Sequence, residues 1–365
     1  MSDEQIDVLL FGLGAIGSFY SFILSRSNRV RLSVVARSNY DAVKSRVCLL
    51  PRCIVPGYTE LADDEYVQGF IIDSQNHGRH TVTPFKVVRT PAEANQTYDY
   101  VVCAHKAIDQ EAAVAQLAPV IDQDRTTIVL IQNGVGNEEP FRKAYPRSTI
   151  ITCVTWTGAT QVEPGLVQHT KSENMQIGLF PNDSADQSVE HSRLDTFASL
   201  LTAGGTVFQA IDDIQRQRWE KVVWNAAWNS LTTLTLLDTR SWLDSSPEAM
   251  PITRRLMHEV IAVGRACGVS TLDDDIVDKL INRILGMPGI GSSMQTDYKE
   301  GRPLEVDAIL GYPFRKSKEL GLSTPTLDTI YAIVMGVDRR WVCPLNLVII
   351  EWIEKCTISD TRPSW

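Results

Sequence analysis

The sequence predicts a chain of two parts, an α/β domain with a mainly parallel sheet followed by an all-α domain. In the first part short apolar runs alternate with helical patterns, and residues 8–37 alone indicate a strand, a turn, a helix and a second strand. From about Ile214 onward helical periodicity dominates. A chain of 365 residues is also long enough for about two domains. We therefore expect the sheet domain at residues 1–210 and the helical domain at residues 211–365.

Charge and cysteine usage narrow the classes of partner. The formal net charge of −9 argues against nucleic acid as a partner, because nucleic acid selects a basic surface. A local basic pocket that binds an anion is still compatible with this charge.

Seven cysteines without a C-x-x-C pair indicate reduced thiols, and no apolar or Arg-rich leader is visible, so we expect a cytoplasmic location. No run of about 20 apolar residues predicts a membrane span. The histidines lack metal-ligand spacing, so we assign no metal.

A glycine-rich turn follows the first expected strand. It matches G-x-G-x-x-G with Gly12, Leu13, Gly14, Ala15, Ile16 and Gly17. Gly12 would allow the tight turn, Gly14 would let the backbone approach a pyrophosphate, and Gly17 would let helix and strand pack closely. Because the turn lies between a strand and a helix, it predicts a Rossmann-type dinucleotide-binding domain. The alternative is a structural glycine turn in another α/β protein.

Arg37 ends the second expected strand, where an NAD enzyme usually has an acidic residue for the ribose diol. An arginine at this position suits the 2′-phosphate of NADP, and Ser38 and Asn39 could add neutral donors. The alternative is an arginine that is simply solvated at a strand end.

Two polar residues follow later strands. Lys106 comes just after the apolar run that ends at Cys103, and Asn133 just after the run that ends at Ile131. Ligands of open α/β sheets bind at the carboxyl ends of parallel strands, so both positions are candidates for contact with a cofactor or substrate. Asn133-Gly134 could also be no more than a turn.

A polar stripe marks the long helix expected after Ile214. Its members are spaced four apart and are interleaved with tryptophans: Lys221, Asn225 and Asn229, with Trp219, Trp224 and Trp228. Spacing of four places side chains along one face of a helix. A partly desolvated lysine has a lowered pKa and can act as a general acid, which favours a polar face lining a cleft. A face open to water or paired across a dimer is the alternative.

Two further candidates lie downstream. Ser293 belongs to a loop that contains glycine, and Glu305 starts the next expected helix. Taken alone, they are an ordinary loop hydroxyl and a favourable first-turn acid.

Together these residues resemble the ketopantoate reductase (2-dehydropantoate 2-reductase) family. The matching pieces are GLGAIG, the arginine of VVAR, HKA, QNG, the K-x-x-x-N-x-x-x-N pattern of KVVWNAAWN, and SSM followed by the acid of GRPLEVD. The resemblance spans Gly12 to Glu305. It implies a Rossmann-type domain followed by a helical domain with the active site between them, NADPH as hydride donor, a 2-oxo acid as acceptor, and a place in pantothenate biosynthesis.

The resemblance also implies roles for the candidates. Lys221 would donate the proton to the forming alkoxide, and Asn225, Asn229 and Ser293 would hold the substrate. Asn133 and Lys106 would contact both cofactor and substrate, and Glu305 would bind the cofactor and order the site. The glycine turn and Arg37 would bind NADPH. We expect reduction of 2-dehydropantoate to pantoate, with no metal and a possible homodimer.

Some positions depart from the family pattern. Ile290 stands where an asparagine often contacts substrate, and Ser230 stands where proline is frequent. Residues 47–85 form an enlarged insertion in which we expect short strands and a hairpin, and the tail beyond residue 340 is extra. We expect the tail to pack on the helical domain, or else to contact a dimer partner. The isoleucine suggests the alternative of a less hydroxylated branched 2-oxo acid such as 2-oxoisovalerate.

A second class of function is a non-catalytic sensor that binds NADPH. The proton donor argues against it, because Lys221 has no use in a protein that only binds the cofactor.

Overall fold

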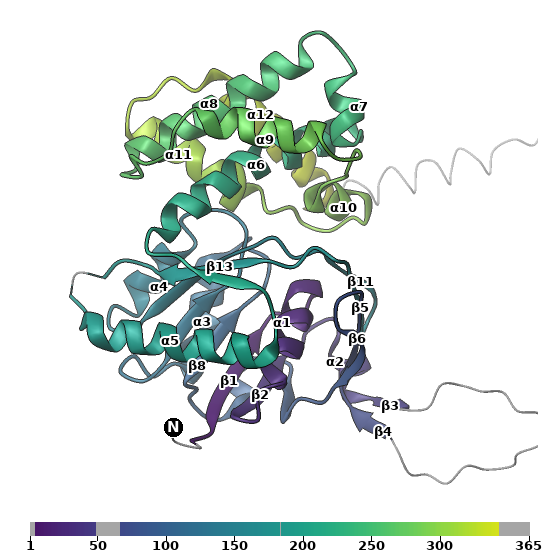
Figure 1. Cartoon of the computed structure of the whole chain (residues 1–365), viewed down its shortest axis with the longest axis vertical. Coiled ribbons are helices and arrows are strands. Elements are labelled where there is room, and N and C mark those ends of the chain that lie inside the picture. Colours follow the sequence, from purple (N-terminus) through teal and green to yellow (C-terminus); the bar gives the residue numbers. More distant parts are fainter. Residues whose placement is uncertain (1–3, 49–65, 183, 343–365) are drawn as a thin grey trace, which may run out of the picture. The chain divides into compact units, whose positions relative to one another are not determined.

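A computed structural model describes residues 4–48, 66–182 and 184–342. The chain divides into two compact units, residues 1–218 and 219–365 (Figure 1). This division and the boundary expected at residues 210–211 differ by residues 211–218, which include the start of helix α6 (Ile214–Thr235). Arg218, the fifth residue of that helix, bonds to other residues of the first unit. The expected tail beyond residue 342 and residues 49–65 of the expected insertion lie outside the described residues.

The first unit is built on the expected parallel sheet. Its strand order is β14-β13-β10-β9-β8-β1-β2-β7, and neighbours from β10 to β7 all run parallel. Strand β13 is antiparallel to β10. The bounds are β1 (Ile6–Phe11), β2 (Val30–Val35), β7 (Lys86–Val88), β8 (Tyr100–Cys103), β9 (Thr127–Leu130), β10 (Ile150–Thr155), β13 (Met175–Leu179) and β14 (Phe208–Ala210).

Helices cover both faces of this sheet, which explains its continuous apolar strands. Successive side chains of β1 point to opposite faces: Val8 and Leu10 join one core cluster, and Leu9 and Phe11 join the other. The first cluster includes residues of α1 (Ala15–Ser25) and α5 (Gln187–Gly204), and the second includes residues of α3 (Gln110–Leu117) and α4 (Glu138–Ala144). The remaining helical elements are α2 (Tyr40–Lys44), η1 (Pro91–Ala94) and η2 (Ala118–Val120).

The insertion forms short strands, as expected where it is described. Strands β5 (Phe70–Ser74) and β6 (Gly78–Val82) make an antiparallel hairpin, and β3 (Arg46–Cys48) pairs with β4 (Tyr66–Gln68). The hairpin extends into a second sheet, of order β11-β12-β5-β6, with β11 (Ala159–Glu163) and β12 (Leu166–His169). Strand β10 of the first sheet and β11 of the second follow each other directly in the chain.

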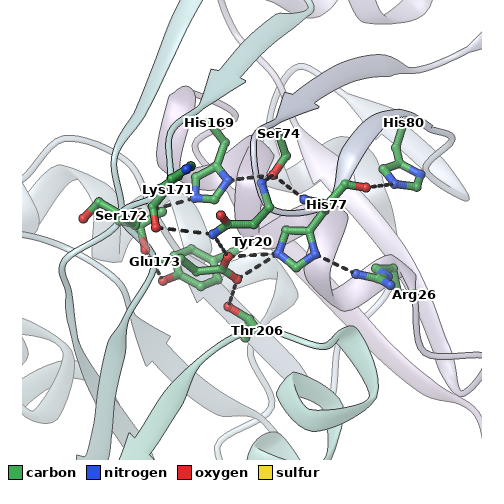
Figure 2. A network of polar contacts seen from close by, with 12 residues as sticks. Tyr20, Arg26, Ser74, His77, His80, His169, Lys171, Ser172, Glu173 and Thr206 are labelled. Atoms are coloured by element: carbon green, nitrogen blue, oxygen red, sulfur yellow. Dashed lines mark hydrogen bonds and ion pairs between the residues drawn. The ribbon is translucent and has the colours of Figure 1, made fainter.

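A polar network joins this second sheet to α1 (Figure 2). Arg26 Nη1 lies 3.1 Å from Nδ1 of His77, and because arginine only donates, that nitrogen must accept and Nε2 must carry the proton. Nε2 then donates to Glu173 at 3.0 Å. Burial alone would raise the pKa of Glu173, but hydrogen bonds from Asn76, Thr206 and His77 hold the pKa below its usual value. Because Arg26 is the C-cap of α1, this contact ties the C-terminal end of the helix to the network.

Helices make up the described part of the second unit, residues 219–342. They are the rest of α6, α7 (Thr239–Leu243), α8 (Ala249–Ala266), α9 (Asp275–Leu285), α10 (Ser293–Lys299), the π-helical turn η3 (Asp307–Gly311), α11 (Tyr312–Glu319) and α12 (Pro325–Val342). Gly268 has φ of 98° just after α8, as expected of a helix-ending glycine. Glu259 of α8 accepts hydrogen bonds from the backbone N–H groups of Thr326 and Leu327, which caps α12.

Among the described residues, no helix is both long and apolar enough to cross a membrane.

Candidate active site

The glycine turn has the geometry that its sequence predicts. Gly12 follows β1 with φ of 104°, and a Cβ there would lie 2.4 Å from the backbone nitrogen of His105. A Cβ on Gly17 would lie 2.0 Å from the carbonyl oxygen of Gly12, so only glycine lets α1 start this close to β1. Gly14, the N-cap of α1, has open space where a Cβ would be. That open side is where a ligand could reach the backbone.

Asn39 holds this turn in place. Its Nδ2 donates to the carbonyl oxygen of Leu13 and, at 2.9 Å, to Oε1 of Gln161, whose own amide donates back to Asn39 Oδ1. Both amide hydrogens are therefore used inside the protein, and the expectation that Asn39 adds a donor for a phosphate is wrong. Arg37 and Ser38 are exposed beyond the end of β2. Gln161 was missed because it lies in a different sheet, far along the chain.

The loops after β8 and β9 are joined to each other beside the glycine turn. The side-chain amide of Gln132 donates to the carbonyl oxygen of His105 at 2.9 Å and accepts from Gln110 at 2.8 Å. The His105 ring packs against Phe11 of β1, with ring centroids 4.7 Å apart. Burial lowers the pKa of His105 to about 4, a bond with Gln110 opposes this, and the charge of Arg37 lowers the pKa further. His105 is therefore neutral at physiological pH, next to the exposed Lys106.

Asn133 is half-buried in the loop after β9. Its carbonyl oxygen accepts a hydrogen bond from Nδ2 of Asn137 at 2.7 Å, and Gly134 and Gly136 have φ of 94° and 77°. The loop is therefore more than the simple Asn-Gly turn of the alternative, because it also contains two left-handed glycines and a side-chain hydrogen bond to its own backbone. The first unit thus brings the glycine turn, Arg37, Lys106 and Asn133 to one edge of the sheet, at the carboxyl ends of the adjacent strands β2, β1, β8 and β9.

The polar stripe of α6 is largely buried. Asn225 and Asn229 are 5% and 4% exposed, and Lys221 is partly exposed. The alternative of a face open to water is therefore wrong for the two asparagines. Nδ2 of Asn225 has no hydrogen-bond partner among the described residues. Such a buried amide costs about 1–3 kcal/mol when it lacks an acceptor, so Asn225 is a candidate for contact with a ligand.

Ser293 lies next to the continuation of the stripe. Thr232, three residues after Asn229 on α6, donates to Oγ of Ser292 at 2.8 Å. Ser292 is the N-cap of α10, and Gln295 in the same helix donates to the carbonyl oxygen of Thr232 at 2.9 Å. Ser293 is the first residue of α10 and is exposed, and it directly follows Ser292, which bonds to Thr232 of α6.

Glu305 is buried, at 6% exposure. It precedes the helical segment at Val306 rather than starting it, because the chain from Arg302 to Glu305 is irregular and the π-helical turn η3 follows. The expectation of a first-turn acid is therefore wrong by one residue. The carboxylate of Asp338 accepts from the backbone N–H of Leu304 at 2.9 Å and fixes this segment. A π-helical turn beside a buried acid is typical of functional sites.

Each unit supplies a different chemistry. The first presents a helix N-terminus, an arginine and a lysine, which suit anionic groups. The second presents one ammonium and two amides along α6 and a hydroxyl at the start of α10, which suit an oxygen-rich ligand whose oxygen gains charge. Among the described residues no cluster of His, Cys, Asp and Glu could hold a metal ion.

Comparisons with known proteins match both units. The family model "Ketopantoate reductase PanE/ApbA" matches residues 8–182, and the model of its C-terminal domain matches residues 213–338. A crystal structure of 2-dehydropantoate 2-reductase from Methylococcus capsulatus is 30% identical, with a TM-score of 0.76 over 92% of this chain and 98% of that one. A 2-dehydropantoate 2-reductase from Nostoc sp. is 24% identical over 93% of this chain and 97% of its own length.

A third solved structure shares the fold of this chain at low sequence identity. The ternary structure of D-mandelate dehydrogenase with NADH and anilino(oxo)acetate has a TM-score of 0.75 over 93% of this chain and all of that one, at 19% identity.

We expect His105 to lower the free energy of unfolding in mild acid. Because the folded chain lowers the pKa of His105 to about 4, the unfolded chain binds more protons below its ordinary pKa of about 6.5. The stabilisation is complete above pH ~6.5 and is lost as pH falls toward ~4, by up to about 1 kcal/mol per pH unit. Urea unfolding at pH 7 and pH 5 should show a smaller pH dependence for His105→Gln than for the wild type.

The matched control is His191→Gln, because His191 is exposed on α5. Equal pH dependence of the His105 variant and the wild type would contradict the neutral, buried state of this ring.

Proposed function

Because this chain belongs to the ketopantoate reductase family of oxidoreductases, we propose that it reduces a 2-oxo acid to a 2-hydroxy acid with NADPH. The substrate that we propose first is 2-dehydropantoate, which would yield pantoate. The single observation that carries this proposal is the stripe of α6, where Lys221 precedes two buried asparagines and the amide nitrogen of Asn225 has no partner among the described residues.

The first unit supports NADPH as the cofactor. The space beside Gly14 lets a pyrophosphate meet the N-terminus of α1, and the exposed Arg37 suits a 2′-phosphate. Because His105 is neutral, it adds no charge beside the exposed Arg37 and Lys106. NADPH, when bound, supplies the hydride. We propose Lys106, Asn133 and Glu305 as further cofactor contacts.

The second unit supports the proton transfer. Hydride addition at C2 of a 2-oxo acid converts the carbonyl oxygen into an alkoxide, which an ammonium can stabilise and then protonate. We propose Lys221 for this step, after which the neutral amine regains a proton from solvent. Asn225, Asn229 and Ser293 would orient the carboxylate and hydroxyl groups as neutral donors, which leaves the charge of the lysine available.

A different branched 2-oxo acid is the second candidate substrate, and Ile290 favours it. The backbone N–H of Ile290 donates to Oγ1 of Thr239 at 3.2 Å and its carbonyl accepts from the Thr239 N–H at 3.1 Å, so the loop holds an apolar side chain before Ser293. The structure of D-mandelate dehydrogenase with NADH has the same fold, which supports including a second substrate and NADH in the test. The candidate of another class remains an NADPH-binding sensor.

A substrate panel tests the proposal directly. We expect purified protein to oxidise NADPH with 2-dehydropantoate, with 2-oxoisovalerate as the competing acceptor and NADH as the competing donor. A higher kcat/KM for 2-oxoisovalerate would select the second substrate. If the protein binds NADPH but turns over no 2-oxo acid, the NADPH-binding sensor is the candidate function that is left.

Lys221→Ala should lower kcat by about 10²–10⁴-fold, because the alkoxide loses its proton donor, while NADPH affinity changes little. Stopped-flow turnover and fluorescence titration with NADPH measure the two quantities. Lys44→Ala, at an exposed position of α2, is the control. Unchanged turnover in the Lys221 variant would refute its role.

Arg37→Ala should weaken binding of NADPH by about 10–100-fold, the loss of one or two charge-assisted hydrogen bonds, and leave NADH binding unchanged. Arg147→Ala removes an equally exposed arginine, paired with Asp124, and should change neither. Equal losses for both cofactors in the Arg37 variant would argue against a 2′-phosphate contact.

A further inference from the structure

A buried ion pair lies behind the loop that carries Asn133. Arg218, in the first turn of α6, has a side chain 2% exposed, and its Nε lies 2.5 Å from Oε1 of Glu138, whose side chain is 1% exposed. We propose that Arg218 and Glu138 are positioning residues that set the place of Asn133 in the reaction. This inference rests on the proposed function in one respect, namely that Asn133 contacts a ligand.

One guanidinium nitrogen reaches both sides of Asn133. Nη1 of Arg218 donates to the carbonyl oxygen of Gln132 at 2.9 Å and to that of Gly134 at 2.8 Å. The carbonyl between them, that of Asn133, accepts from Asn137. Three successive peptide groups are therefore held, and with them the direction in which the Asn133 side chain leaves the backbone.

Glu138 makes this arrangement possible. A buried guanidinium without a counter-charge is strongly unfavourable, and Glu138, the first residue of α4, supplies the charge. Its Oε1 also accepts from Oγ1 of Thr152 in β10 at 2.6 Å, so the carboxylate is itself anchored to the sheet. Lysine could not replace Arg218, because an ammonium lacks the planar fork that serves Glu138 and two carbonyl groups together.

Burying an ion pair costs desolvation free energy that apolar side chains do not incur. Apolar side chains of similar size are often neutral or stabilising at such positions, so the pair is better explained by what it orients than by the stability it adds. The guanidinium of Arg218 bonds to the loop around Asn133, to Glu138 at the start of α4 and to Thr152 of β10, and α6 carries Lys221 three residues later.

The experiment compares Arg218→Lys with wild type in two backgrounds, with and without Asn133→Ala. We expect Arg218→Lys to lower kcat/KM about 100-fold, as for a misplaced contact, and to lower it less than about 3-fold further when Asn133 is already alanine. A purely structural role would lower activity by the same factor in both backgrounds, and that result would overturn the proposal.

A second variant guards against misfolding. Arg218→Met combined with Glu138→Leu removes both charges, so it should fold. Backbone amides of residues 133–137 should exchange with deuterium at least about 10-fold faster in this variant, because the loop carbonyls lose their donors and the loop opens locally. The exposed pair Arg147→Met with Asp124→Leu is the control and should leave this exchange unchanged.

Exchange also separates the two proposals. If the folded double variant shows wild-type exchange at residues 133–137, the positioning inference fails whatever the activity. If exchange at residues 133–137 rises in the double variant but the wild-type protein turns over no 2-oxo acid, the result supports the role of Arg218 and Glu138 in holding the loop. In that case only the proposed function fails.

Discussion

The close approach of α1 to β1 is the constraint on which the first unit depends. A Cβ on Gly17 would lie 2.0 Å from the carbonyl oxygen of Gly12, and a Cβ on Gly12 would lie 2.4 Å from the backbone of His105. No rotamer can relieve a clash with backbone, so helix, turn and neighbouring loop fit only with glycine at both positions. This contact places the N-terminus of α1 beside the loops that follow β8 and β9.

Side-chain hydrogen bonds then connect these loops, since loops lack the ladder bonds that hold strands. Asn39 with Gln161 holds the glycine turn, Gln132 joins the loops after β8 and β9, and Arg218 with Glu138 holds the far side of Asn133. These side-chain bonds support the loops from within, and Arg37 and Lys106 lie exposed at the same edge of the sheet.

The second unit organises its polar groups differently, along one helix. The buried amides of Asn225 and Asn229 cost stability unless an acceptor meets them, and within the described part of the chain the amide nitrogen of Asn225 has none. Around this row the fold keeps Ser293 near the helix end through Thr232 and Ser292. Ile290, in the loop that precedes Ser293, is apolar. We expect such a side chain to affect substrate specificity, which the shared fold does not determine.

The sequence by itself determined the order of the two parts, the parallel sheet, the glycine turn and the stripe of α6, because each is a local pattern of period, spacing or turn chemistry. Tertiary structure alone decided that Asn39 faces inward to Gln161, that Glu305 precedes a π-helical turn, and that Arg218 and Glu138 pair in the core. Those pairings join residues as many as 122 positions apart. No local pattern marks such partners, since only packing chooses which distant side chain satisfies a buried polar group.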